Sequence, residues 1–136
     1  MPKLLRQISL LLLLALVPAG AAGLFHPRRP AWQSDEIVAG TAESWGEKVI
    51  WVDARPPAEF ESGHIPGALS LNEEAWDASL PPLLDAWAPE KIVVVYCSTL
   101  SCQASHEVAH RLRDEVGLKE VRVLQGGWEA WRRLHP

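Results

Sequence analysis

The chain has 136 residues, of which 48% are hydrophobic and 22% are charged, and its formal net charge is -4. This length suits a single domain, because domains commonly run to roughly 100–150 residues, and the apolar content is sufficient for a packed core. No basic run is longer than Arg28-Arg29 or Arg132-Arg133, which argues against a nucleic-acid-binding surface.

The first 25 residues have the layout of an export signal. Two basic residues, Lys3 and Arg6, precede an apolar stretch at residues 8–25, and this stretch contains the small residues Ala19-Gly20-Ala21, which suit signal cleavage. Its 18 residues just reach the roughly 18–20 that a membrane-spanning helix needs. Residues 1–25 are therefore predicted to be a cleaved signal peptide or a transmembrane anchor, and both alternatives stay open.

Both alternatives place the rest of the chain on the extracytoplasmic side of a membrane, in the cell envelope or periplasm, either anchored or secreted. If the segment is uncleaved, it makes the membrane a partner of the chain. Residues 26–35, which contain two prolines, are expected to form a linker, and residues 36–136 a single domain. In such compartments disulfides can persist, which matters for the only two cysteines, Cys97 and Cys102.

The first part of the domain alternates between short strands and short helices. The continuous apolar run that ends at Asp53 is typical of a strand covered on both faces, and prolines at the start of the next segment suit the first turn of a helix. In chain order we expect a strand at Glu36–Val38, a helical turn at Thr41–Trp45, a strand at Lys48–Asp53, a helix at Pro56–Glu61, a turn at Gly63–Gly67 and a strand at Ala68–Leu71.

The second part carries the strongest signals. Glu73–Trp87 has a helical pattern, but Pro81-Pro82 interrupts it and predicts two helical pieces. Ile92–Tyr96 predicts a buried strand. A helix follows from about Gln103–Ser105, with an apolar stripe at Ala104, Val108, Leu112 and Val116, and Gly117 suits its end. The last two predicted elements are a strand at Glu120–Leu124 and a helix at Gly127–Leu134.

Strands that alternate with helices predict an α/β fold, a doubly wound and mainly parallel five-stranded sheet with helices on both faces. In such folds, ligands bind beyond the carboxyl ends of the strands. Cys97 occupies this position, directly after the strongest predicted strand. The sequence therefore directs attention to the loop that Cys97 begins.

The loop residues Ser98, Thr99, Leu100, Ser101, Cys102 and Gln103 must turn before the next helix. If they curl around Cys97, their amide N–H groups converge on its sulfur, with the positive end of the helix behind them. The thiolate is the reactive form of cysteine, and fixed amides stabilise negative charge on sulfur or on a persulfide built upon it. Cys97 is therefore the candidate nucleophile, although a buried structural cysteine is the alternative.

Cys102 adds a second possibility to this loop. Two cysteines that flank one tight loop can form a disulfide if their Cα atoms lie within about 7 Å of each other. We therefore consider Cys102 as a resolving thiol for Cys97, against the alternative that it packs as a small apolar residue.

Three blocks of the sequence resemble the single-domain rhodanese family, from about Glu36 to the end. Each is a weak motif alone, but the three occur in order and at fitting spacing. The blocks are Val52-Asp53-Ala54-Arg55 with Glu59-Phe60 and Gly63-His64-Ile65-Pro66-Gly67-Ala68, then Val93–Cys97, then Leu124-Gln125-Gly126-Gly127-Trp128 with Trp131.

The resemblance implies a rhodanese-like fold and a sulfurtransferase that moves sulfane sulfur through a persulfide of Cys97. Its partners would be a small sulfur donor, such as thiosulfate, and a thiol or protein acceptor, with no cofactor and no metal. By position, Ser98 to Cys102 would cradle the sulfur. Asp53 and Arg55 would be supporting residues that brace adjacent loops.

The loop departs from the family pattern, because residues 98–103 contain no cation and Cys102 stands near where an arginine is often found. Without an arginine to hold phosphate, phosphatase activity is the weakest enzyme interpretation. Two further alternatives are a non-catalytic binding module of the same fold and a thiol–disulfide redox protein that uses Cys97 and Cys102.

Three histidines are further candidates for functional residues. His64 lies in the Gly63–Gly67 turn, where a role in loop geometry is favoured over a role as proton carrier. His106 and His110 lie one helical turn apart, but the pair lacks further metal ligands, so a solvated helix face is expected.

Overall fold

The computed structural model describes residues 1, 3–7, 35–98 and 103–136. The chain divides into two compact units, Met1–Gln33 and Ser34–Pro136. In the first unit, residues 3–7 are helical. Within the described ranges no helix is long and apolar enough to cross a membrane, and the apolar stretch at residues 8–25 lies outside them.

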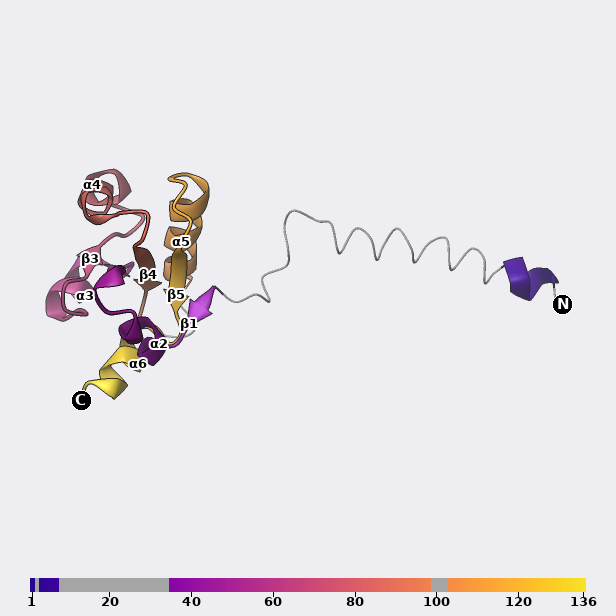
Figure 1. The fold of residues 1–136 in the computed structure, drawn as a ribbon, viewed down its shortest axis with the longest axis horizontal. Coiled ribbons are helices and arrows are strands. Elements are labelled where there is room, and N and C mark those ends of the chain that lie inside the picture. Colours follow the sequence, from indigo (N-terminus) through magenta and orange to yellow (C-terminus); the bar gives the residue numbers. More distant parts are fainter. Residues whose placement is uncertain (2, 8–34, 99–102) are drawn as a thin grey trace. The chain divides into compact units, whose positions relative to one another are not determined.

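The second unit contains one sheet of five parallel strands in the order β1-β5-β4-β2-β3 (Figure 1). The central strand β4 pairs with β2 along its whole length, from Val49 opposite Ile92 to Asp53 opposite Tyr96. This arrangement confirms the predicted α/β class with a five-stranded parallel sheet. The strands are β1 (Glu36–Ile37), β2 (Val49–Asp53), β3 (Leu69–Ser70), β4 (Ile92–Tyr96) and β5 (Val121–Leu124).

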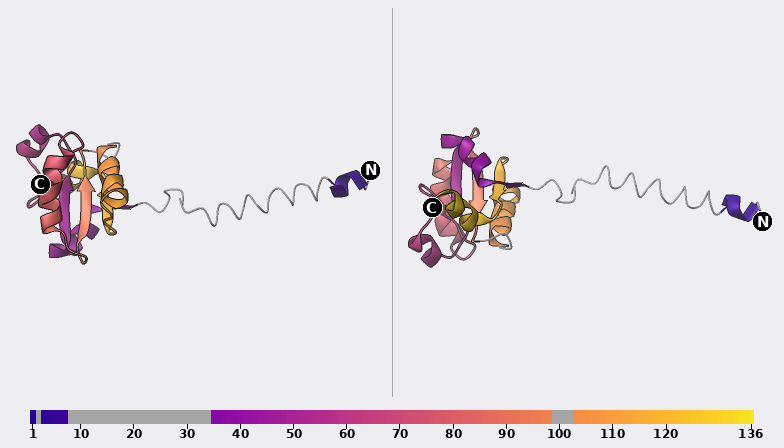
Figure 2. Two further views of the ribbon diagram at one scale, coloured as in Figure 1. Left: turned by 90° about the horizontal axis from the view of Figure 1, so that it is seen from above. Right: turned by 90° about the horizontal axis from the view of Figure 1, so that it is seen from below.

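Helices cover both faces of the sheet, as predicted (Figure 2). Because side chains alternate along a strand, Val93 and Val95 face one side and Val94 and Tyr96 the other. The first side packs against α4 and α5, and the second against α2, α3 and α6. The helices are α2 (Ala39–Ser44), the 3-10 helix η1 (Gly46–Lys48), α3 (Pro57–Ser62), α4 (Trp76–Ala86), α5 (Ala104–Asp114) and α6 (Gly127–Leu134).

The predicted break at Pro81-Pro82 is wrong, since α4 runs without interruption through both prolines. Each proline lacks the N–H that would bond to the carbonyl four residues earlier. Pro81 and Pro82 lie on the exposed side of α4, so the carbonyls of Asp77 and Ala78 can bond to water instead. Burial of other side chains of the helix, among them Leu83, holds α4 against the sheet.

Of the apolar stripe predicted for the helix after the cysteine loop, Ala104, Val108 and Leu112 lie on α5, whereas Val116 lies beyond the end of the helix at Asp114. Val108, Ala109 and Leu112 are fully buried against β4 and β5. Gly117 follows the helix with φ +83°, a left-handed conformation that glycine adopts without steric cost. This helix therefore places its N-terminus at the carboxyl end of β4, where the cysteine loop begins.

Candidate functional site

Cys97 lies directly beyond the carboxyl end of β4. It is only 4% exposed, and the structure holds it in a disulfide bond. The sequence has one other cysteine, Cys102, which lies with Thr99, Leu100 and Ser101 outside the described residues. The structure thus gives the position and backbone setting of Cys97 and Ser98, while the predicted cradle at residues 99–102 is not described.

The first turn of α6 holds the backbone of the cysteine loop. The N–H of Trp128 donates to the carbonyl of Cys97 at 2.7 Å, and the N–H of Glu129 donates to the carbonyl of Ser98 at 3.2 Å. The first N–H groups of a helix have no partner within it, so the loop carbonyls satisfy two of them. In a trans peptide the C=O and N–H groups point in opposite directions, so the N–H of Ser98 points away from α6.

Gly127 makes this close approach possible. Its φ is +55°, and a Cβ atom at this position would lie 2.2 Å from the carbonyl oxygen of Cys97. The preceding Gly126 also has a left-handed backbone, with φ +75°. Residue 127 must therefore be glycine for both conformational and steric reasons.

Asp53 and Arg55 form a buried ion pair at the end of β2, next to β4. Arg55 is 2% exposed and Asp53 is fully buried. The Nη2 atom of Arg55 donates to Asp53 at 2.6 Å and to the carbonyl of Gly63 at 2.7 Å, and Nε donates to both carboxylate oxygens of Asp53. Burial disfavours the charged guanidinium, but the hydrogen bond and charge of Asp53 outweigh this and raise the pKa of Arg55.

Two aromatic rings flank the Arg55 guanidinium. Its central carbon lies 5.0 Å from the ring centre of Trp128 and 5.7 Å from that of Tyr96. The hydroxyl of Tyr96 accepts a hydrogen bond from the N–H of Ile65 at 3.1 Å. Burial raises the pKa of Tyr96, which keeps the hydroxyl neutral. Arg55 thus links the end of β2 and the turn after α3 to the helix that holds the Cys97 carbonyl.

Ser98 contacts a side chain that the sequence did not indicate. Its hydroxyl donates to the Glu59 carboxylate at 3.0 Å, and the same Glu59 oxygen lies 3.9 Å from Nη1 of Arg55. This hydroxyl proton is therefore directed to α3 and not toward Cys97. At the other end of the loop, Gln103 is the N-cap of α5, and its side-chain amide donates to Glu107 at 3.0 Å.

The histidines have partners outside the loop. The His64 ring stacks on Phe60 at 3.8 Å between ring centres, and its Nδ1 lies 2.8 Å from the carbonyl of Phe60. His106 pairs with Glu36 and His110 with Asp114. No cluster of three potential metal ligands occurs among the residues that the structure describes.

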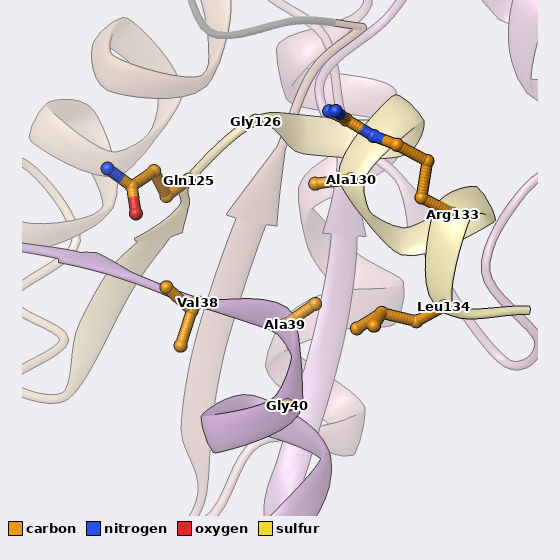
Figure 3. A pocket seen from close by; sticks show the side chains of 8 residues that line it. All are labelled: Val38, Ala39, Gly40, Gln125, Gly126, Ala130, Arg133 and Leu134. Atoms are coloured by element: carbon orange, nitrogen blue, oxygen red, sulfur yellow. The ribbon is translucent and has the colours of Figure 1, made fainter.

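A separate groove of about 520 Å³ lies between the chain at the end of β1 and helix α6 (Figure 3). Val38 and Ala39 line it on one side, and Ala130, Arg133 and Leu134 on the other. Of the predicted site residues that the structure describes, none lines this groove.

The sequence placed Glu59, Gly127 and Trp128 in the blocks that resemble the family, but it did not indicate that they contact the cysteine loop. Each reaches Cys97 or Ser98 across about 30 or more residues of sequence. The one local signal was Gly126-Gly127 directly after a strand, since adjacent glycines at a strand end mark a close approach of backbone.

Comparisons with known proteins agree with this geometry. The family model described as "Rhodanese-like domain" matches residues 40–134. The thiosulfate sulfurtransferase GlpE of Coxiella burnetii is 35% identical over 88 residues, which cover 65% of this chain and 76% of that protein. The M-phase inducer phosphatase 1-B of Xenopus laevis is 29% identical over 105 residues, but the match spans only 19% of that protein and 68% of this chain.

Among solved structures, the BH2092 protein of Bacillus halodurans superposes with a TM-score of 0.61 at 24% identity, over 76% of this chain and 74% of that one. This likeness supports the fold. The match of the family model over residues 40–134 shows that the chain belongs to the rhodanese-like domain family.

Proposed function

We propose that the chain is a sulfurtransferase that carries sulfane sulfur on Cys97. In the first step, the Cys97 thiolate attacks the outer sulfur of a donor, a new S–S bond forms, and the donor remnant leaves with the electron pair of the broken bond. With thiosulfate the remnant is sulfite. In the second step, a nucleophilic acceptor attacks the outer sulfur of the persulfide and releases the Cys97 thiolate.

One observation carries this proposal: backbone N–H groups in the first turn of α6 hydrogen-bond to the carbonyls of Cys97 and Ser98. The bond to the Cys97 carbonyl turns the N–H of Ser98 away from α6, and we propose that this N–H contributes to the cradle around the sulfur. Fixed backbone N–H groups can stabilise an anionic sulfur without a charged side chain, which fits a loop whose sequence has no cation. We extend the same role to Thr99, Leu100, Ser101, Cys102 and Gln103, which are proposed to complete the cradle.

The relatives include both a phosphatase and thiosulfate sulfurtransferases, so the choice depends on the loop. Phosphate recognition in a cysteine loop needs a cation, best supplied by a forked arginine. Residues 98–103 contain none, and the nearby Arg55 is buried and bonded to Asp53. These features favour sulfur transfer over phosphate hydrolysis.

The proposed setting is extracytoplasmic, with residues 1–25 as signal peptide or membrane anchor, 26–35 as linker and 36–136 as the catalytic domain. The partners are a small sulfur donor and a thiol or protein acceptor. Mass spectrometry of the chain purified from membrane and soluble fractions tests the location. A chain that begins at Met1 and is found only in the cytosol would contradict it.

A turnover assay tests the activity. The full-length chain is first reduced and freed of reductant, then mixed with thiosulfate or another sulfane donor and with cyanide as acceptor. With thiosulfate, we expect sulfite and thiocyanate in equal amounts. The Cys97→Ser variant should lose this turnover. Equal turnover by wild type and Cys97→Ser would contradict the proposal, and a folded chain that turns over no donor would favour the binding-module alternative.

A thiol–disulfide role is the second candidate, and the observation that favours it is the disulfide at Cys97. We propose that Cys102 is its partner and acts as a resolving thiol that protects Cys97 from overoxidation. Peroxide treatment followed by thiol reduction should restore the wild type but not Cys102→Ser, whose Cys97 would advance to the sulfinic acid. Equal recovery of both proteins would contradict a resolving role for Cys102.

A further inference from the structure

The carboxylate of Glu59 stands next to the cysteine loop, and its charge is not neutralised. It accepts the hydroxyl of Ser98, the residue after Cys97, and its side chain is 48% exposed. Arg55 lies within 3.9 Å, but it already forms a closer, multiply bonded pair with Asp53. Asp53 neutralises Arg55, so Glu59 leaves this three-residue cluster with one net negative charge.

Three helices adjoin the loop. Helix α3 contacts Ser98 through Glu59, α6 contacts it through the backbone, and α5 begins where the loop ends. Each has a glutamate in its first turn, namely Glu59, Glu129 and Glu107. Glu107 accepts a bond from Gln103, and Glu129 lines a pocket with Arg132 and Arg133, whereas Glu59 bonds directly to the residue after Cys97. The charge of Glu59 therefore acts next to Cys97, in addition to the positive N-terminal ends of α5 and α6.

From this geometry we propose that Glu59 sets donor specificity, by disfavouring anionic sulfur donors and favouring persulfides whose carrier group is neutral or cationic. This inference rests on the proposed sulfur transfer at Cys97. Ser98 follows Cys97 at a Cα distance of about 3.8 Å, so the Glu59 carboxylate lies within roughly 10 Å of the reacting sulfur. At such a distance, near a protein surface, one unit charge changes the binding of another severalfold.

The chemistry is the same for each donor. The Cys97 thiolate attacks the terminal sulfur of R–S–SH, the S–S bond of the donor breaks, and R–S⁻ leaves with its electron pair while Cys97 retains the S–SH group. The donors differ in the charge on R and also in the pKa of the leaving thiol, so each rate is divided by the rate at which the same donor reacts with a small free thiol. Thiosulfate is a dianion, so it should load Cys97 most slowly when each donor's rate is compared with its intrinsic reactivity.

The test uses three persulfides that differ only in the carrier: 2-aminoethyl (cationic), 2-hydroxyethyl (neutral) and 2-carboxyethyl (anionic). The rate of persulfide formation at Cys97 is followed by intact mass on the reduced full-length chain. After this division, we expect the second-order loading rate constant of the aminoethyl donor to exceed that of the carboxyethyl donor roughly five- to tenfold at low salt, and the ratio to shrink in high salt.

The variant Glu59→Gln keeps an oxygen acceptor for Ser98 and removes the charge. It should bring the ratio of aminoethyl to carboxyethyl rates down severalfold, and the hydroxyethyl rate of the same variant is the reference for both, since a neutral carrier does not sense the charge. Glu61→Gln is the matched control, because Glu61 is an exposed glutamate on the same helix, whereas the glutamate that bonds to Ser98 is Glu59. It should retain the wild-type ratio.

The inference fails if Glu59→Gln keeps the wild-type ratio or if Glu61→Gln lowers it equally. A merely structural role of Glu59 would slow all three donors alike, which also contradicts the inference. If no donor places sulfur on Cys97 of the folded chain, the sulfurtransferase proposal fails as well. If all three load Cys97 at one common rate, only the specificity inference fails.

Discussion

The two faces of the sheet are built differently. The face that packs against α4 and α5 holds an apolar cluster, with Val93, Val95 and Leu112 among its buried residues. The face that packs against α3 and α6 also holds the buried Asp53–Arg55 pair, and Tyr96 and Trp128 flank its guanidinium. Burying charges costs free energy unless each is paired, so an apolar face is the simpler way to stabilise a sheet.

This difference indicates a division of labour. The apolar face supplies stability, whereas the polar face joins β2, the turn after α3 and the N-terminus of α6, which holds the carbonyls of Cys97 and Ser98. Substitutions on the first face should change stability alone. Substitutions on the second should change both stability and the reactivity of Cys97, and the following measurements test that distinction.

The largest effect is expected from Arg55→Ala. This change leaves the Asp53 carboxylate buried without its partner, which typically costs about 3–5 kcal/mol of unfolding free energy. It should also reduce sulfur loading of Cys97 in the molecules that remain folded. Urea unfolding measures the first effect and donor loading the second.

Arg113→Ala is the control for this prediction, because the Arg113–Asp35 pair is partly exposed. Removing such a pair is expected to cost less than about 1 kcal/mol. Equal losses in the two variants would refute the special role assigned to Arg55.

Leu112→Ala tests the apolar face. Leu112 is fully buried on α5, and truncation of a buried leucine to alanine costs about 2–5 kcal/mol. The rate of sulfur loading per folded molecule should stay at the wild-type value. A loading defect as large as that of Arg55→Ala would show that the two faces do not divide these roles.

Gly127→Ala combines a conformational cost with a clash. A left-handed backbone costs an alanine roughly 1–2 kcal/mol, and its Cβ would also press on the Cys97 carbonyl. We expect lower stability and slower loading. In Gly117→Ala the left-handed cost is similar, but no atom of the other described residues lies within 4 Å of the added Cβ, so loading should be unchanged. Matching loading rates in the two variants would rule out the α6 contact as a determinant of reactivity.

The smallest effect concerns Tyr96, the only tyrosine of the chain. Because its pKa is raised in the folded state, the folded chain keeps the hydroxyl proton above pH about 10, where the unfolded chain releases it. The stability contribution is complete below that pH and is lost as pH rises, at about 1.4 kcal/mol per pH unit. Ultraviolet titration of tyrosinate should show a later midpoint in the folded chain than in urea, and coincident midpoints would contradict the buried hydroxyl.

The sequence predicted the sheet and both of its covering layers, because the apolar periods of Ile92–Tyr96 and of α5 are local signals. It wrongly divided α4, because proline rules do not account for exposed carbonyls that water can satisfy. It indicated Cys97 as the candidate nucleophile, because Cys97 directly follows a predicted strand. It could not indicate the Glu59–Ser98 contact or the Gly127–Cys97 approach, which depend on how distant segments pack.

The central claim is that Cys97 carries the transferred sulfur. The most direct test is intact-mass and peptide mass spectrometry of the reduced full-length chain after brief exposure to a sulfane donor. The account predicts the gain of one sulfur atom, located on the peptide that contains Cys97 and absent in Cys97→Ser. A folded, reduced chain that gains no sulfur, or gains it only on Cys102, would contradict the account.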